Sequence, residues 1–92
     1  MMISLEEAKN YLRVDTADDD TLIQNILIAA EKLCMDILRT DEQSVLEAEP
    51  NAKVAVLYAT AYLYEHREEA DHHALTLTLR SLLFASREEA SF

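Results

Sequence analysis

The 92-residue sequence contains no glycine, only one proline and only one cysteine. Type I′ hairpin turns, phosphate-binding loops and dinucleotide-binding fingerprints all need backbone conformations that glycine adopts most easily, so the sequence excludes nucleotide-binding motifs of these kinds. A single cysteine cannot form an intrachain disulfide. The sequence also shows no secretory signal and no run of about 20 apolar residues. We therefore expect one helical domain that is made and kept in a cytoplasm.

Basic residues are scarce, with 8 lysines and arginines against 18 acidic residues and a net charge of -10. Unassisted binding to a nucleic acid backbone is therefore not expected. The acidic charge concentrates in three stretches, residues 1–20, 41–50 and 68–74, which carry net charges of -4, -4 and -3. These stretches are predicted helix ends and links. In a ring they would repel passing DNA, although an acidic surface that only aids solubility explains the charge equally well.

The spacing of apolar residues predicts about four helices, over approximately residues 4–13, 21–39, 50–67 and 74–87. Ser4 followed by Glu7 fits a capping box at the start of the first helix. An aspartate of the link that follows is expected to cap the second helix. Pro50 suits the first position of the third helix, where its missing N–H is not needed.

The last predicted helix contains an ambiguous segment. Residues 75–79, Leu-Thr-Leu-Thr-Leu, alternate as a strand would, but no other segment resembles a partner strand. Because a lone strand leaves its backbone groups unpaired, this segment is predicted to be helical. The sequence therefore predicts an all-α fold, a single small domain with short polar links.

Two of the predicted helices have more apolar surface than one small core can cover. Within residues 54–64, 10 of 11 residues are apolar, which places apolar side chains on every side of that helix. In the second helix, Ile28 and Met35 lie off the main apolar stripe. A neighbouring subunit is the simplest cover for this excess, so we expect a homo-oligomer.

The sequence contains residue types that can act in catalysis or metal binding, but their spacing matches no such site. Cys34 lies on the apolar stripe of the second helix, so we expect a buried, unreactive thiol. Seven acidic residues and histidines crowd into residues 65–73, where Glu69 and His72 have a Glu-x-x-His spacing. A di-metal helical bundle needs two such motifs and also inward-facing glutamates from two further helices. The chain has one such motif, and Glu31 of the second helix is expected off the main apolar stripe, where it would not face inward. We therefore expect no catalytic residue, metal or cofactor, and predict that the protein is not an enzyme.

The tyrosines and arginines of the third and fourth helices are candidates for contact. Tyr58 and Tyr62 share a helix face that core packing explains, whereas Tyr64 points in another direction. An outward tyrosine on an apolar helix is typical of protein interfaces, where its hydroxyl can stay hydrated. Arg67 and Arg87 each lie near a predicted helix end beside acidic residues. An interaction with the helix dipole and an ion pair between subunits explain these arginines equally well.

Three blocks of sequence follow one another over nearly the whole chain. The first comprises Ile3-Ser4-Leu5-Glu6-Glu7-Ala8-Lys9, Leu12-Arg13-Val14-Asp15, Asp18-Asp19-Asp20 and Leu22-Ile23. The second is Tyr62-Leu63-Tyr64-Glu65-His66-Arg67-Glu68, and the third joins Leu82-Leu83 to Arg87. In this order the blocks resemble the small head-tail connector, or adaptor, proteins of tailed bacteriophages and prophages.

The resemblance implies a structural virion protein that forms a ring below the portal and extends the DNA channel to the tail. Such rings follow the symmetry of the portal, which implies a cyclic homo-oligomer of about twelve subunits. The implied partners are other copies of the chain, the portal protein and a tail completion or stopper protein. DNA would pass through without specific binding, and no membrane would be involved. The protein would be synthesised in the bacterial host cytoplasm and act in the virion, in assembly and DNA packaging.

Two groups of residues are predicted to serve this function. The predicted contacts with a neighbouring subunit or the portal are Tyr62, Tyr64, Arg67, Leu82, Leu83 and Arg87. The predicted exposed acidic edge consists of Asp18, Asp19 and Asp20. A small acidic helical protein that acts as a dimeric interaction or regulatory module explains the composition and charge equally well. It does not explain the three ordered blocks.

Overall fold

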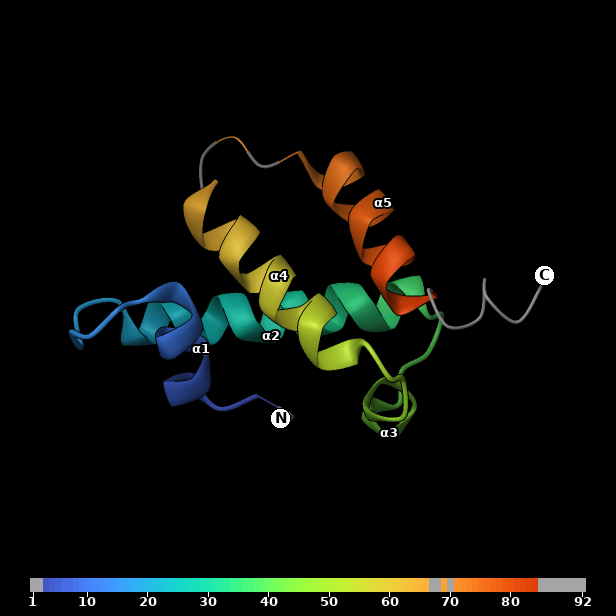
Figure 1. The fold of residues 1–92 in the computed structure, drawn as a ribbon, viewed down its shortest axis with the longest axis horizontal. Helices are drawn as coiled ribbons and strands as arrows, with labels where there is room; N and C mark the ends of the chain where they lie inside the picture. The colour runs from blue at the N-terminus through green and yellow to red at the C-terminus, as the bar shows by residue number, and fades with distance from the viewer. Residues whose placement is uncertain (1–2, 67–68, 70, 85–92) are drawn as a thin grey trace.

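A computed structural model of the chain describes residues 3–66, 69 and 71–84, and these residues form an all-helical single domain (Figure 1). Its helices are, in chain order, α1 (Leu5–Leu12), α2 (Asp20–Ile37), α3 (Gln43–Glu47), α4 (Ala52–Glu65) and α5 (His72–Leu83). The long helix α2 packs along α4, and α5 lies against both. At the other end of α2, α1 packs on α2 and α4, whereas α3 lies near the C-terminal end of α2. The all-α prediction is confirmed.

The first helix begins where the sequence places it. The Ser4 side chain accepts a hydrogen bond from the Glu7 backbone N–H at 3.1 Å. The Glu7 carboxylate does not complete a capping box, because it forms an ion pair with Lys53 Nζ at 2.7 Å. Glu7 thus ties α1 to α4 instead of capping its own helix.

Two arginines take the left-handed backbone conformation that glycine usually occupies after a helix. Arg13 (φ 62°) ends α1, and Arg39 (φ 58°) follows α2. The N–H groups of Arg13 and Val14 donate to the carbonyls of Asn10 and Lys9, at 3.2 and 2.9 Å, in the pattern of a Schellman motif. This conformation costs an L-residue about 1 kcal/mol, so the chain ends both helices sharply at some expense.

The link between the second and third predicted helices differs from expectation. Residues 43–47 form an additional short helix, α3, which brings the described helices to five, and its Leu46 is completely buried. A single turn is too short to give a periodic apolar signal, which is why the sequence predicts about four helices rather than five. The next helix begins at Ala52 instead of Pro50, and its N-cap Asn51 donates to the Leu82 carbonyl on α5 at 2.9 Å. Pro50 therefore lies one residue before the cap.

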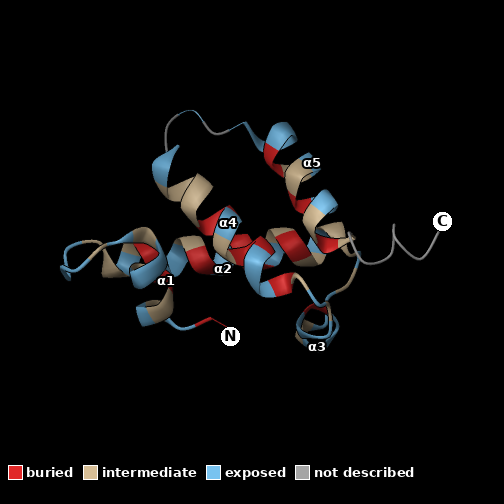
Figure 2. Cartoon of the chain, in the orientation of Figure 1, coloured by how far each residue is buried: buried red, intermediate tan, exposed pale blue. Residues whose placement is uncertain are grey.

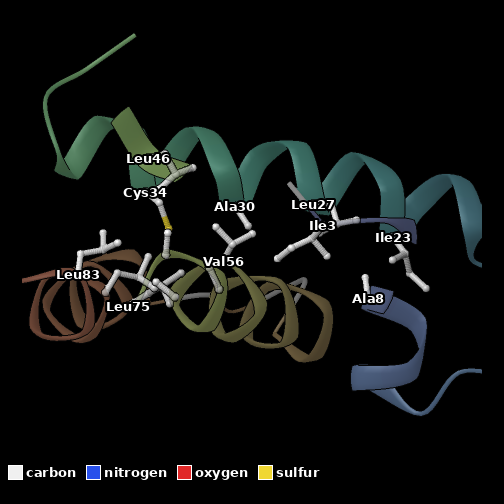
Figure 3. Packing of buried hydrophobic residues seen from close by; sticks show 14 residues of the cluster. Ile3, Ala8, Ile23, Leu27, Ala30, Cys34, Leu46, Val56, Leu75 and Leu83 are labelled. Atoms are coloured by element: carbon white, nitrogen blue, oxygen red, sulfur yellow. The ribbon is translucent and has the colours of Figure 1, made fainter. Parts of the chain in front are cut away.

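The core lies where α2 faces the other helices. Figure 3 shows the side chains of Ile23, Leu27, Ala30 and Cys34 pointing from α2 toward α1, α4 and α5. The ambiguous Leu-Thr-Leu-Thr-Leu segment is helical, and α5 buries its leucines at helical spacing, at positions 75, 79 and 83. Buried and exposed segments alternate along α2 and α5, as one-sided packing requires (Figure 2).

Large apolar side chains also remain exposed on the outer faces of the domain. Ile28, Val54 and Leu77 are each more than half exposed, and they lie on α2, α4 and α5 respectively. Within the described part of the chain, no helix is both long and apolar enough to cross a membrane. The apolar surplus seen in the sequence is thus spread over several surfaces of the folded chain.

Candidate functional site

All four tyrosines of the chain line one surface groove between α1 and the C-terminal half of α4. The groove has a volume of about 620 Å³, and we call it the tyrosine groove; its lining residues are Tyr11, Leu12, Arg13, Tyr58, Ala61, Tyr62, Tyr64, Glu65 and His66. Tyr11 is 50% exposed and Tyr58 is 39% exposed. The expectation that core packing explains Tyr58 is therefore wrong, because that side chain is exposed in the groove.

The hydroxyls of the two predicted contact tyrosines are bonded within the chain. Tyr64 Oη donates to Asp19 Oδ2 at 2.6 Å, which fastens the α1–α2 link to α4. Tyr62 Oη accepts from the Asp71 backbone N–H at 2.9 Å, and its ring stacks on His66 with centroids 4.3 Å apart. Asp71 in turn caps α5. Both tyrosines are half-buried, so each offers part of its ring to the groove while its hydroxyl holds a link in place.

The predicted acidic edge is divided between exposed and engaged carboxylates. Asp18 is exposed, whereas Asp19 and Asp20 are half-buried. Asp19 accepts from Tyr64, and Asp20 Oδ1 lies 2.6 Å from Lys9 Nζ. Asp19 occupies the N-cap position of α2, but its side chain makes no capping hydrogen bond.

The remaining predicted contact residues differ in how far they are buried. Leu82 is half-buried on α5, and its carbonyl accepts from Asn51. Leu83 is completely buried, so its side chain belongs to the core of the single chain. Arg67 and Arg87 lie outside the described residues.

A second hollow lies between α2 and α3. It has a volume of about 330 Å³, and we call it the α2–α3 pocket; it is lined by Ile28, Glu31, Lys32, Met35 and Gln43. Glu31 is only 8% exposed, although the sequence placed it off the apolar stripe. Its position four residues after Leu27, on the row that also contains Ile23, is the signal that could have shown this burial.

Polar atoms in this pocket lack partners. Among the described residues, Glu31 Oε2 and Gln43 Nε2 are buried and have no hydrogen-bond partner. Lys32 does not neutralise Glu31, because Lys32 Nζ bonds Asp36 Oδ1 at 2.6 Å. That hydrogen bond and the charge of Asp36 raise the pKa of Lys32. The pocket therefore presents an acceptor and a donor to whatever enters it.

The other residue types that could carry chemistry are the single cysteine and the potential metal ligands. Cys34 is buried as expected, and its pKa is raised to about 12 by burial and, secondarily, by the charge of Glu31. A thiol with this pKa is unreactive at neutral pH. Across the described ranges, no group of three or more histidine, cysteine or acidic side chains is placed to hold a metal ion.

Comparison with curated proteins and with solved structures finds no match. The family model described as "Phage gp6-like head-tail connector protein" matches residues 2–89. This span includes the tyrosine groove and the α2–α3 pocket, and it confirms the resemblance of the three sequence blocks. Members of this family are structural components of the phage rather than enzymes. The chain belongs to the phage gp6-like head-tail connector protein family.

Proposed function

We propose that this connector protein assembles as a closed ring below the portal and extends the DNA channel toward the tail. Membership of the connector family supports a structural role in contact with other virion components. The ring follows the symmetry of the portal, with about twelve subunits. The protein is made in the host cytoplasm and functions in the virion.

The observation that carries this proposal is the presence of large exposed apolar groups on different faces of one small domain. Tyr11 and Tyr58 are exposed in the tyrosine groove, whereas Ile28 is exposed at the α2–α3 pocket. A closed ring needs two different surfaces on each subunit, because each subunit contacts one neighbour with one surface and the next neighbour with the other. A two-fold dimer would need only one self-complementary surface.

The charge distribution supports a conduit that does not retain DNA. The α1–α2 link carries exposed Asp18 and Asp15, and exposed Asp41 and Glu42 precede α3. With a net charge of -10, acidic groups facing a channel would repel a phosphate backbone. We assign Asp18, with its neighbours Asp19 and Asp20, to such an edge.

The tyrosine groove is our candidate for contact with a neighbouring subunit or the portal. Tyr62 and Tyr64 contribute their rings, and Leu82, Arg67 and Arg87 extend the proposed contact residues along the chain. Leu83 is buried in the core, on the turn of α5 that contacts the N-cap of α4. Tyrosine suits such a surface because its ring supplies apolar area at a low cost in side-chain entropy.

Absolute mass tests the ring directly. We would measure purified protein by size-exclusion chromatography with light scattering, over a series of protein and salt concentrations. A discrete species of about ten to fourteen subunits supports the ring. A strict dimer at every concentration overturns it and favours the dimeric regulatory alternative. If the chain is monomeric, we would repeat the measurement with purified portal protein. Failure of the chain to co-elute with the portal would then overturn the proposal.

A further inference from the structure

The α2–α3 pocket holds a buried carboxylate oxygen that the described chain leaves without a hydrogen-bond partner. Glu31 is 8% exposed, and its Oε2 accepts no hydrogen bond among the described residues. The nearest cation on the same helix, Lys32, is bonded to Asp36. Because a buried carboxylate oxygen without a partner costs free energy, the pocket favours occupation by a cation from outside the chain.

The shape of the pocket favours a long basic side chain. Ile28 and Met35 form apolar walls around Glu31, and Ile28 is 53% exposed. An arginine can lay its aliphatic stem on such walls while its guanidinium donates to a carboxylate. Gln43 adds a buried Nε2 without a partner in the described residues, so the occupant should also bring an acceptor.

One exposed segment of the same chain offers both groups. Arg13 follows the last residue of α1, is exposed, and forms no ion pair within the described ranges. The last carbonyls of a helix have no intrahelical partner, and the Schellman hydrogen bonds use only those of Lys9 and Asn10. The carbonyls of Tyr11 and Leu12 are thus available as acceptors in the two residues before Arg13.

We propose that the C-terminal end of α1 in one copy docks into the α2–α3 pocket of a second copy, with Arg13 donating to Glu31. This inference rests on the proposed ring and identifies its subunit contact. The two surfaces lie on different elements, α1 with α4 and α2 with α3, as a head-to-tail contact requires (Figure 1). A carbonyl at the end of α1 accepts from Gln43, and exposed Tyr11 covers the apolar wall at Ile28.

The other described arginines without an ion pair fit less well. Arg39 follows α2 and lines neither the groove nor the pocket. Arg80 is exposed on α5 and lines neither the groove nor the pocket. Arg80 is therefore the matched control for a change of charge at Arg13.

Charge reversal followed by mixing tests the contact. Arg13→Glu alone places two carboxylates in each contact, and Glu31→Lys alone places two cations there. We expect each variant to need at least about thirtyfold more protein than the wild type to assemble, because each loses a buried charge pair. A mixture of the two variants can alternate around a ring and restore a cation–carboxylate pair at every contact. We expect the mixture to assemble at the wild-type concentration, with equal amounts of both variants by native mass spectrometry.

Controls separate this contact from misfolding and from the proposed function. Arg80→Glu should assemble as the wild type does, and Glu31→Gln, which keeps the shape, should weaken assembly with unchanged helical circular dichroism. Assembly of both reversed variants at the wild-type concentration would falsify the contact. A mixture of the two variants that stays monomeric would also contradict it, as would a loss of assembly with Arg80→Glu as large as that with Arg13→Glu. A wild-type chain that never self-associates also overturns it, whereas co-elution with the portal separately decides the proposed function.

Discussion

The tyrosine groove and the α2–α3 pocket differ in how their polar groups are satisfied. At the groove, the Tyr64 hydroxyl bonds Asp19 and the Tyr62 hydroxyl bonds Asp71. At the pocket, Glu31 Oε2 and Gln43 Nε2 are buried without partners in the described chain. The hydroxyls of Tyr62 and Tyr64 are thus bonded within one copy, whereas two buried polar atoms of the pocket are not.

This difference shows that exposed apolar area and unsatisfied polar groups indicate different things about a binding partner. Both surfaces expose large apolar side chains, so area alone would rank them as equal candidates for contact. Apolar area contributes affinity to many partners, whereas a buried charge accepts only a partner that neutralises it. The groove is therefore suited to supply contact area and the pocket to select the partner and fix the register.

The largest predicted effect concerns Cys34, three residues after Glu31 on α2. Its pKa of about 12, against 9.0 for an unperturbed thiol, makes the thiolate about a thousandfold scarcer at pH 8. We expect a disulfide reagent to label the native chain at least about a thousandfold more slowly than the urea-unfolded chain. Labelling within a factor of ten of the unfolded rate would show that the pocket end of α2 opens locally.

The same pKa has a consequence for stability. Because the pKa is raised in the folded state, the protonated thiol stabilises the fold below pH 9, and this contribution is lost as the pH rises toward 12. Relative to Cys34→Ala, the free energy of unfolding of the wild type should fall by about 1.4 kcal/mol per pH unit in that window. Urea unfolding of both proteins at pH 8, 9, 10 and 10.5 measures the slope, and parallel curves would contradict it.

Tyr64→Phe tests whether the hydrogen bond from Tyr64 to Asp19 stabilises the single copy. The change removes the hydroxyl that donates to the Asp19 carboxylate at 2.6 Å and keeps the ring. A hydrogen bond to a charged, half-buried group contributes about 1.5 kcal/mol, so the free energy of unfolding should fall by that amount. Tyr58→Phe is the matched control, because Tyr58 is 39% exposed, and it should leave stability unchanged. Equal effects of the two substitutions would show that the Asp19 contact contributes nothing to folding.

Much of the fold could be predicted from the sequence because its helices are long and carry a periodic apolar stripe. The stripe of Ile23, Leu27, Ala30 and Cys34 gives the core face of α2 directly. Helix α3 could not be predicted, because its five residues span little more than one turn and are buried mainly through Leu46. Its burial depends on tertiary packing against α2 and α4 rather than on any local pattern.

The candidate surfaces were less predictable, because each combines residues from separate elements. The sequence indicates that Tyr62 and Tyr64 are candidates for contact, but it cannot show that Tyr11, more than fifty positions away, lines the same groove. The sequence does not show the burial of Glu31, because charged residues normally lie on the solvent face. The pocket forms only because Gln43 of α3 lies beside four residues of α2, a contact that no local pattern shows.

Glu31→Met should raise the free energy of unfolding, whereas Tyr64→Phe should lower it. Replacing an unpaired, buried carboxylate with an apolar side chain of similar length removes a desolvation cost, so the monomer should gain about 1 kcal/mol. The gain should appear in urea unfolding at a protein concentration below assembly, because association would add its own stabilisation. Gln24→Met, at an exposed position of α2, controls for the change in side chain and should be neutral. A monomer that loses stability would instead reveal an intrachain partner for Glu31.

The smallest effect distinguishes a fixed polar contact from a solvated one. Lys9 and Asp20 form an ion pair of 2.6 Å with side chains 18% and 36% exposed, whereas the Lys32–Asp36 pair has the same length but is 63% and 56% exposed. We expect Lys9→Met to lower the free energy of unfolding by about 0.5 kcal/mol, because its pair joins α1 to α2 in a half-buried setting. Lys32→Met should cause no measurable change, since solvent and salt screen its pair. Urea unfolding with and without 1 M salt, a concentration at which the Debye length is about 3 Å, compares the two. A larger loss for Lys32→Met would mean that its side chain supports the wall of the pocket, and the difference between the two regions would then lie in packing rather than in paired charges.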